Sequence, residues 1–403
     1  MASILFINRY FWPDTSATAQ MLTDLAIDLA ASGHKVVVLA GRYSYQHADT
    51  ALPLADNHGG VVIRRLRSSN FGRFSRLGRM VDYISFYLSA IATVLWRCGR
   101  GAIVVVKTDP PLLSVPIAAL SLLKGFKLVN WIQDLFPEVA ANAGIGLARG
   151  RAGAWLMQMR DWSLRQAAMN VVIGEQMHSA LWRRGISSAQ LRVICNWGLA
   201  PLASGPPIGL RSQWHLSDRF VVMYSGNMGE AHDHETIIQA VERLANDPEV
   251  TFLFVGGGTK LRRLLDRTHE LGLPNVQSYP LQAREHILES LQVGDLHLIS
   301  LRPEFDSQIV PSKYYGILGA GRPAVFIGSF DNEISCEILR ENIGCVVLQG
   351  EVDALVASIL DAKNRPQHRH QQGERARALF ESRYTRLAAI RQWSALIESI
   401  DAQ

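Results

Sequence analysis

The chain has 403 residues, of which 48% are hydrophobic and 19% are charged, and its formal net charge is +5. This composition excludes an intrinsically disordered chain, and the length suits two domains at roughly 100–200 residues each. The four cysteines lie far apart, in the pattern of neither a disulfide framework nor a zinc site: Cys98, Cys195, Cys336 and Cys345.

The sequence predicts neither a signal peptide nor a spanning helix. Its first residues lack a basic segment followed by a long apolar stretch. The longest apolar stretch, 112–123, contains Pro116 and is shorter than the ~20 residues that cross a bilayer. We therefore expect a cytoplasmic protein.

The first half alternates buried strands with helices. A short apolar run at 3–8 predicts a strand, a helix follows and ends near Gly33, and 35–40 predicts the next strand. Such a strand–helix–strand unit builds doubly wound sheets. Further strands are predicted at 102–107, 126–132, 170–173 and 192–195.

A turn rich in Pro, Gly, Ala and Ser at 196–207 separates this half from a second series of strands and helices. Strands of the second series are predicted from 219 onward and at 250–255, 276–279, 296–300, 324–327 and 345–347. The fold class is therefore α/β with two doubly wound domains. We place them at 1–200 and 218–385, joined by a linker at 201–217, with a final helix at 386–403 packing back on the first domain.

An arginine-rich stretch lies between Asp56 and Asp82 and contains no acidic residue. An aromatic and aliphatic segment, 83–96, follows it. A basic loop before an amphipathic helix is typical of a surface that docks on anionic lipid, and also of a solvated loop ahead of a core helix. Nucleic acid is not an expected partner, because no recognition helix or aromatic sheet motif accompanies the arginines. These are Arg64, Arg65, Arg67, Arg73, Arg76 and Arg79.

Three loops of the second half follow predicted strands, where ligands of open α/β sheets bind. Small residues let backbone amides approach an anion, and a helix N-terminus adds partial positive charge. A lysine at a helix start opposes the helix dipole, so Lys313 indicates a bound anion. The loops contain Gly226 and Asn227; Gly256, Gly257 and Gly258; and Pro311, Ser312 and Lys313.

Several ligand motifs are absent from the sequence. No two aspartates are separated by one residue, and no His/Glu set has metal-ligand spacing. A nucleoside-triphosphate loop and the glycine fingerprint of NAD sites are also missing. Protein cations and helix amides would therefore receive a leaving diphosphate without a metal or another cofactor.

The sequence resembles bacterial family 4 glycosyltransferases of the GT-B fold, especially the branch similar to colanic-acid and O-antigen fucosyl- or fucosaminyl-type transferases. The segments that carry the resemblance run in family order along nearly the whole chain. The segments are Tyr10-Phe-Trp-Pro, Gly33-His-Lys-Val, Asp109-Pro-Pro-Leu, Gln133-Asp-Leu-Phe-Pro-Glu, Asn196-Trp, Gly226-Asn-Met-Gly-Glu-Ala-His and the stretch that starts with Val310-Pro-Ser-Lys-Tyr-Tyr-Gly.

The resemblance implies two Rossmann-like domains that face each other across a cleft. The second half would bind a nucleotide sugar, with Leu281 and Tyr314 beside the three loops, and the first half would present the acceptor. Transfer would proceed with retention at the anomeric carbon. The acceptor-side candidates are Thr15, Ser16, Ala17 and Glu138.

The chain departs from the family pattern at four positions. Asn227 and His232 match an arginine and a lysine that grip the diphosphate, and two glutamates that hold the sugar and ribose match Gln308 and Gly316. Lys313 could replace the cations and Glu304 could replace part of the glutamate function. The catalytic candidates are thus Lys313, Glu304 and Asp134, although Asp134 could equally cap a turn.

The sequence thus predicts a retaining, metal-independent glycosyltransferase that uses a nucleoside-diphosphate sugar, with UDP the expected nucleotide. Its acceptor would be a polyprenyl-diphosphate-linked or other saccharide of surface-polysaccharide assembly. Arg73, Arg76 and Arg79 would hold it peripherally on the inner, anionic face of the membrane. Two alternatives stay open: a nucleotide-sugar epimerase of the same fold, and a catalytically silent scaffold that binds nucleotide sugar.

Overall fold

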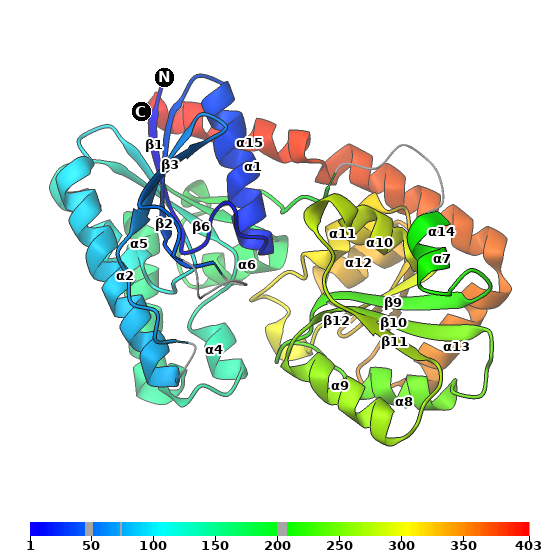
Figure 1. Ribbon diagram of the computed structural model, residues 1–403. Helices are drawn as coiled ribbons and strands as arrows, with labels where there is room; N and C mark the ends of the chain where they lie inside the picture. Colours follow the sequence, from blue (N-terminus) through cyan, green and yellow to red (C-terminus); the bar gives the residue numbers. More distant parts are fainter. Residues whose placement is uncertain (45–50, 73–74, 200–207, 403) are drawn as a thin grey trace. The chain divides into compact units, whose positions relative to one another are not determined.

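A computed structural model describes residues 1–44, 51–72, 75–199 and 208–402. The chain forms two compact units, each an α/β structure with helices on both faces of one sheet (Figure 1). Unit 1 comprises Met1–Cys195, Gln308–Val310 and Ala389–Gln403, and unit 2 comprises Asn196–Ser307 and Pro311–Ala388.

Unit 1 contains an eight-stranded sheet that is parallel except at one edge, where β3 runs antiparallel to β4. The chain order reverses between the neighbours β1 and β5, which makes their carboxyl ends a topological switch point. The strands in spatial order are β3 (Ala55–His58), β4 (Val61–Leu66), β2 (Lys35–Gly41), β1 (Ser3–Ile7), β5 (Ile103–Lys107), β6 (Lys127–Ile132), β7 (Met169–Val172) and β8 (Leu191–Val193).

The core of unit 1 lies between this sheet and its helices. Phe86 and Val94 of α2 and Ile117 of α3 pack on β5 and β6, whose strands are buried on both faces and therefore read as continuous apolar runs. Trp131 and Trp393 contact each other with ring centroids 4.8 Å apart, which seats the C-terminal helix on unit 1. The helices are α1 (Ala17–Ala31), α2 (Arg76–Arg97), α3 (Ser114–Lys124), α4 (Glu138–Asn142), α5 (Gly150–Gln166), α6 (Glu175–Arg183) and most of α15 (Arg386–Asp401).

The first part of the arginine-rich stretch forms a strand and not a loop. Arg64 and Arg65 belong to β4, which pairs with the short strand β3. Arg65 is buried and contacts Asp56 at 3.5 Å, and it also donates to the carbonyl of Trp12 at 2.7 Å. These two arginines therefore act within the sheet edge rather than as a basic surface loop.

Unit 2 contains a six-stranded sheet in which every pairing is parallel. Its switch point lies between β9 and β12. The strands in spatial order are β11 (Val276–Tyr279), β10 (Val250–Gly257), β9 (Phe220–Asn227), β12 (Leu296–Ser300), β13 (Ala324–Ile327) and β14 (Gly344–Val347).

Helices cover both faces of this sheet, and a separate core cluster lies on each face. Tyr224, Phe252 and Phe254 pack against α8, α9 and α13. Met223 and Leu253 pack against α10. The first helix, α7, lies inside the stretch expected to be a linker, and it contacts α10; the expected linker is therefore partly a helix of unit 2. The helices are α7 (Ile208–Gln213), α8 (Glu235–Arg243), α9 (Thr259–Glu270), α10 (Ile287–Val293), α11 (Lys313–Gly319), α12 (Glu333–Arg340), α13 (Val352–Asn364), α14 (Pro366–Leu379) and the π-helix η5 (Phe380–Tyr384).

Candidate active site

The loops after β9 and β10 approach each other closely, and glycines make this possible. Gly226 and Gly256 pair across the two strands, and a Cβ atom on Gly256 would collide with the carbonyl of Gly226. Gly258 is restricted in the same way by the carbonyl of Met228, and all three glycines have positive φ. The predicted donor-site glycines are therefore required by the fold itself, whereas Gly257 faces open space.

The N-terminus of α9 already has a carboxylate beside it. Glu230 accepts a hydrogen bond from the Thr259 hydroxyl at 3.2 Å and contacts Lys260 Nζ at 3.3 Å. The Lys260 amide donates to the carbonyl of Met228 at 3.0 Å. The positive end of this helix is thus partly satisfied by the protein, which leaves the end of β9 as the more open place for an anion.

Lys313 begins α11 and points beneath the loop that follows β9. Its Nζ atom lies 3.3 Å from the centroid of the Tyr224 ring, and its Cε is 3.7 Å from the position of a Cβ on Gly226. The nitrogen is buried and has no hydrogen-bond acceptor among the described residues. Burial lowers the pKa of Lys313 well below its usual value. A bound anion would supply an acceptor for this amine and would favour its protonated form.

His232 lies beside the same lysine. Its Nδ1 is 2.6 Å from the carbonyl of Ser300 at the end of β12, so the ring carries its proton on Nδ1 and donates it there. Burial, together with the charge of Lys313, lowers the pKa of His232 to about 3. This histidine is neutral at pH 7. Positive charge at the switch point can come from Lys313, whose amine is buried, and from Arg302, which donates to the carbonyl of Glu230 at 3.2 Å and pairs with Glu304.

The other predicted donor-side residues differ in their surroundings. Tyr314 is buried and its hydroxyl donates to Glu337 at 2.8 Å, so that hydroxyl is already used within the core. Glu304 forms an ion pair with Arg302. Pro311 is buried, while Ser312 and Leu281 are exposed. The side chain of Ser312 does not cap α11.

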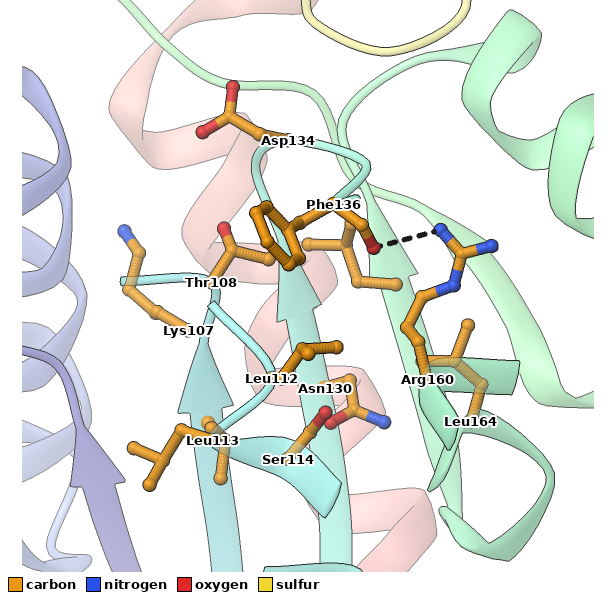
Figure 2. Close-up of a pocket in the computed structure, with 12 residues that line it drawn as sticks. Lys107, Thr108, Leu112, Leu113, Ser114, Asn130, Asp134, Phe136, Arg160 and Leu164 are labelled. Carbon is orange, nitrogen blue, oxygen red and sulfur yellow. Dashed lines mark hydrogen bonds between the residues drawn. The ribbon is translucent and has the colours of Figure 1, made fainter. Parts of the chain in front are cut away.

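In unit 1, three titratable side chains follow the adjacent strands β5 and β6. Lys107 is buried, donates to the carbonyl of Thr18 at 3.0 Å and lies 3.7 Å from the centroid of the Trp131 ring. Burial lowers its pKa to about 7, against the opposing effect of Asp134 and Asp109. Figure 2 shows Lys107 and Asp134 at the ends of the two strands.

The two carboxyl groups of this cluster have raised pKa values. Burial raises the pKa of Asp109 to about 6, Asp14 adds to the rise, and Arg9 and Lys107 oppose it. Burial and the neighbouring Asp109 also raise the pKa of Asp134 to about 6, although Asp134 is exposed and water screens part of this effect. Carboxyls that titrate near neutrality suit proton transfer.

Two cavities border the cluster. The smaller, of about 30 Å³, lies beneath the β5 and β6 loops in Figure 2 and includes Asn130, whose Oδ1 has no partner among the described residues. Its size suits about one water molecule. The larger, of about 340 Å³, opens at the switch point of unit 1. It is lined by Arg9, Tyr10, Gly41, Tyr43, Ser44, Ser68, Ser69, Asn70, Gly72, Arg79, Asp82, Tyr83 and Asp109.

The larger cavity has a rigid wall. Asp82 is buried and accepts hydrogen bonds from the Ser69 hydroxyl and from the amides of Phe71 and Gly72, at 2.7–2.8 Å. The guanidinium of Arg9 lies between the rings of Tyr10 and Tyr83, 5.2 and 5.0 Å from their centroids. Guanidinium, carboxyl and phenol groups together can hold a polyhydroxylated ligand.

The predicted acceptor-side residues do not line this cavity. Ser16 caps α1, where its amide donates to Asp14 at 2.8 Å, and Thr15 and Ala17 adjoin it. The hydroxyl oxygens of Thr15 and Ser16 are buried without a partner among the described residues. Glu138 forms a bidentate ion pair with Arg160, with both contacts at 2.9 Å, and so serves the structure of unit 1.

Of the three predicted membrane arginines, Arg79 is exposed and lines the larger cavity. Arg73 and the side chain of Arg76 lie outside the described residues. The sequence pattern did not identify Arg9, Lys107 and Asp109 as site residues. The available signal was their position directly after predicted strands on both sides of a switch point.

Among the described residues, no group of three or more His, Cys, Asp or Glu side chains is arranged to hold a metal ion. In the same part of the chain, no helix is both long and apolar enough to cross a bilayer.

Comparison with known proteins identifies the family. A model of the glycosyl transferase 4-like domain matches residues 16–197, and a model of the glycosyl transferases group 1 matches residues 210–379. The chain belongs to the family 4 glycosyltransferases of the GT-B fold. It is therefore a glycosyltransferase, and this membership does not favour the epimerase or the silent scaffold.

Individual relatives agree with this assignment. The chain is 28% identical over 386 residues to the putative colanic acid biosynthesis glycosyl transferase WcaI of Escherichia coli K12, covering 91% of this chain and 93% of the relative. Sucrose-phosphate synthase of Thermosynechococcus elongatus shares the fold with a TM-score of 0.77 at 16% identity and covers the whole of both chains. HepE of Anabaena, solved with UDP-glucose, gives a TM-score of 0.72 at 17% identity over 99% of this chain and all of HepE.

Proposed function

We propose that this glycosyltransferase moves a sugar from a nucleoside-diphosphate donor, with UDP as the nucleotide, to a lipid-linked saccharide during surface-polysaccharide assembly. The reaction retains the anomeric configuration and needs no metal. The observation that carries the proposal is the buried amine of Lys313 beside Gly226 at the switch point of unit 2, which has no hydrogen-bond acceptor among the described residues. The named role of WcaI in colanic acid biosynthesis and the UDP-glucose bound to HepE support the pathway and the donor class.

In this proposal the donor diphosphate lies against the end of β9 and takes Lys313 as its cation. The incoming anion supplies the charge partner that the buried amine lacks, and it raises the pKa of Lys313 so that the amine is protonated when the diphosphate leaves. His232 stays neutral and holds the β12 loop through the Ser300 carbonyl. A single buried cation thus replaces the arginine and lysine found in relatives.

Thermal unfolding with a panel of UDP-, GDP- and dTDP-sugars tests the donor. A true donor at 100 times its Kd adds ~2.7 kcal/mol to the free energy of unfolding. We expect one UDP-sugar to stabilise the protein and to be consumed when a membrane extract supplies the acceptor. The proposal fails if no nucleotide sugar stabilises the protein and none is consumed.

The proposed lipid-linked acceptor requires unit 1 to approach a bilayer, and α2 offers a surface for this. One side of α2 packs on the core through Phe86, Ala90 and Val94. Large apolar side chains on the helix remain exposed, with Trp96 at 85% and Leu77 at 74%. The exposed set is Leu77, Met80, Val81, Ile84, Leu88, Leu95 and Trp96.

The charge on this helix favours an anionic leaflet as the occupant. Asp82 is the acidic residue of α2, and it is buried and satisfied by the 69–72 loop, so the outer side of the helix carries no negative charge. Arg79 and Arg97 add positive charge near its two ends. A helix with an apolar side, an interfacial tryptophan and only basic exposed charges is typical of monotopic membrane binding.

Sedimentation with phosphatidylglycerol vesicles tests this surface. Replacing Leu77, Ile84 and Leu88 together with serine removes three inserting side chains, each worth on the order of 1 kcal/mol, and should weaken binding on the order of 100-fold. Leu339→Ser, at an exposed position of α12 in unit 2, is the matched control and should bind normally. Wild-type protein that never pellets, even at low salt, contradicts membrane association.

A further inference from the structure

Unit 2 carries an arginine cluster at the edge of its sheet opposite to the candidate donor site. Asp295 precedes β12 and is 11% exposed at its side chain. Arg211 contacts it at 2.9 Å, and Arg369 lies 3.9 Å from its other oxygen. Arg322, which precedes β13, is within electrostatic range of the same carboxylate. The single negative charge of Asp295 therefore cannot neutralise the positive charges of all three guanidinium groups.

Arg322 has a buried donor that no acceptor among the described residues meets. Its Nη2 donates to the carbonyl of Gln292 at 2.6 Å, while its Nε is buried without an acceptor among the described residues. Burial and the charges of Arg211 and Arg369 lower the pKa of Arg322. A buried guanidinium with unmet donors is costly unless an acceptor is bound.

An open cavity of about 640 Å³ gives access to this group, which is within the range of small-molecule sites. Of the two carboxylates in its lining, Glu381 pairs with Arg377 at 3.1 Å, and Glu374 is exposed to solvent, 3.7 Å from His370. The floor is rigid, because a Cβ on Gly373 would collide with the carbonyl of Gly321. The lining also includes Arg322, Arg369, Pro366 and Ala378.

We propose that this cavity, the arginine pocket, binds a phosphate-bearing anion, with Arg322 and Arg369 as its principal ligands. It is separate from the donor site. Lys313 lies at the carboxyl edge of the sheet and starts α11, whereas the arginine pocket lies at the amino edge, beyond the other end of α11. A planar guanidinium with free N–H groups matches the oxygens of a phosphate.

Equilibrium dialysis of the full chain against radiolabelled pyrophosphate at fixed ionic strength tests the proposal. We expect two equivalents to bind. Arg322→Gln should weaken one of them about 10- to 100-fold, as expected for losing a charged hydrogen-bonding group, and Lys313→Ala should weaken the other. The double variant Arg377→Gln/Glu381→Gln is the matched control: it removes an ion pair from the same lining without changing the net charge, and it should bind both equivalents.

Arg322→Gln also loses the hydrogen bond to the Gln292 carbonyl and could therefore misfold. A second variant distinguishes misfolding from loss of the anion ligand. Ala378→Glu changes an exposed residue of α14 that lines the cavity, and it should remove the same equivalent by charge repulsion while leaving the arginines in place. The proposal is overturned if both variants bind pyrophosphate as the wild type does. Failure of the donor site would appear separately, as an unchanged stoichiometry in Lys313→Ala.

Discussion

Replacing Lys313 with methionine should stabilise the empty protein and cripple the enzyme. The substitution keeps the apolar stem of the side chain but removes the amine. That amine is buried on the Tyr224 ring and has no hydrogen-bond acceptor in the part of the chain that the structure describes. Leaving a buried polar group unsatisfied costs about 1–3 kcal/mol. The contact with the aromatic face offsets only part of this, because the ring attracts a cation and the buried amine is largely neutral. The net gain on removing the amine is therefore expected to be about 1 kcal/mol.

The stability difference between Lys313→Met and the wild type should depend on pH. The folded pKa of Lys313 is lowered, so between that value and about 10.4 the unfolded chain binds a proton that the folded chain does not. The contribution of Lys313 to stability therefore rises with pH across this window. Lys313→Met loses this dependence, so its stability advantage should be greatest at pH 7 and should shrink as the pH approaches 10.

Urea unfolding at pH 7, 8, 9 and 10 measures the stability difference, and turnover of the UDP-sugar that stabilises the protein measures activity. Loss of one electrostatic group at a leaving diphosphate typically lowers kcat 10²- to 10³-fold. The donor should also stabilise the variant less than the wild type. Near wild-type kcat in a folded variant would refute the role of Lys313, and a variant less stable at pH 7 than at pH 10, relative to wild type, would refute the account of its burial.

Three further outcomes are expected. Asp109→Asn should lower kcat/KM for the acceptor about 100-fold and remove the loss of activity below about pH 6, whereas a profile unchanged from wild type would exclude Asp109 as the titrating group. Gly256→Ala should destabilise unit 2 by about 2 kcal/mol in thermal unfolding, because φ is 137° and the added Cβ meets the Gly226 carbonyl, while the control Gly257→Ala, which faces open space, should be nearly neutral. Full activity in excess EDTA is expected, and loss of activity that Mn²⁺ or Mg²⁺ restores would contradict the metal-independent mechanism.

The regular elements were predictable where burial leaves a clear pattern. Strands such as β5 and β12 are buried along their whole length and read as apolar runs, and the apolar and basic character of α2 was evident. The β3–β4 hairpin was missed, because β3 is the polar run Ala55–His58 at a half-exposed edge and β4 carries two arginines. There Arg65 pairs with Asp56, a contact that no local pattern signals.

The candidate site was predictable in its loops but not in its contacts. Lys313 stood out as a cation that opposes a helix dipole, yet its position on Tyr224 depends on how α11 packs against β9. Arg9 and Asp109 are separated by about a hundred residues and meet because β1 and β5 are neighbours at the switch point. Sequence order conceals such pairs, whereas the rule for ligand positions in open sheets locates them once the strand order is known.

The family resemblance implies two cations at the donor loop, and the presence of Asn227 and His232 at the matching positions has a consistent electrostatic explanation. A lysine at position 232 would lie beside Lys313 with little water to screen the two charges. The pKa of His232 is depressed mainly by burial, and the charge of Lys313 lowers it further. A neutral histidine that donates to the Ser300 carbonyl avoids this repulsion and fixes the β12 loop. Asn227 is uncharged as well, while Arg302 and Lys260 are paired with Glu304 and Glu230. Lys313 is therefore the buried cation beside the loop that is not in an ion pair among the described residues, and an arriving diphosphate would favour its protonation. In the empty site Lys313 is largely neutral, which avoids most of the free-energy cost of a buried charge. Lys313 gains its proton when the diphosphate binds.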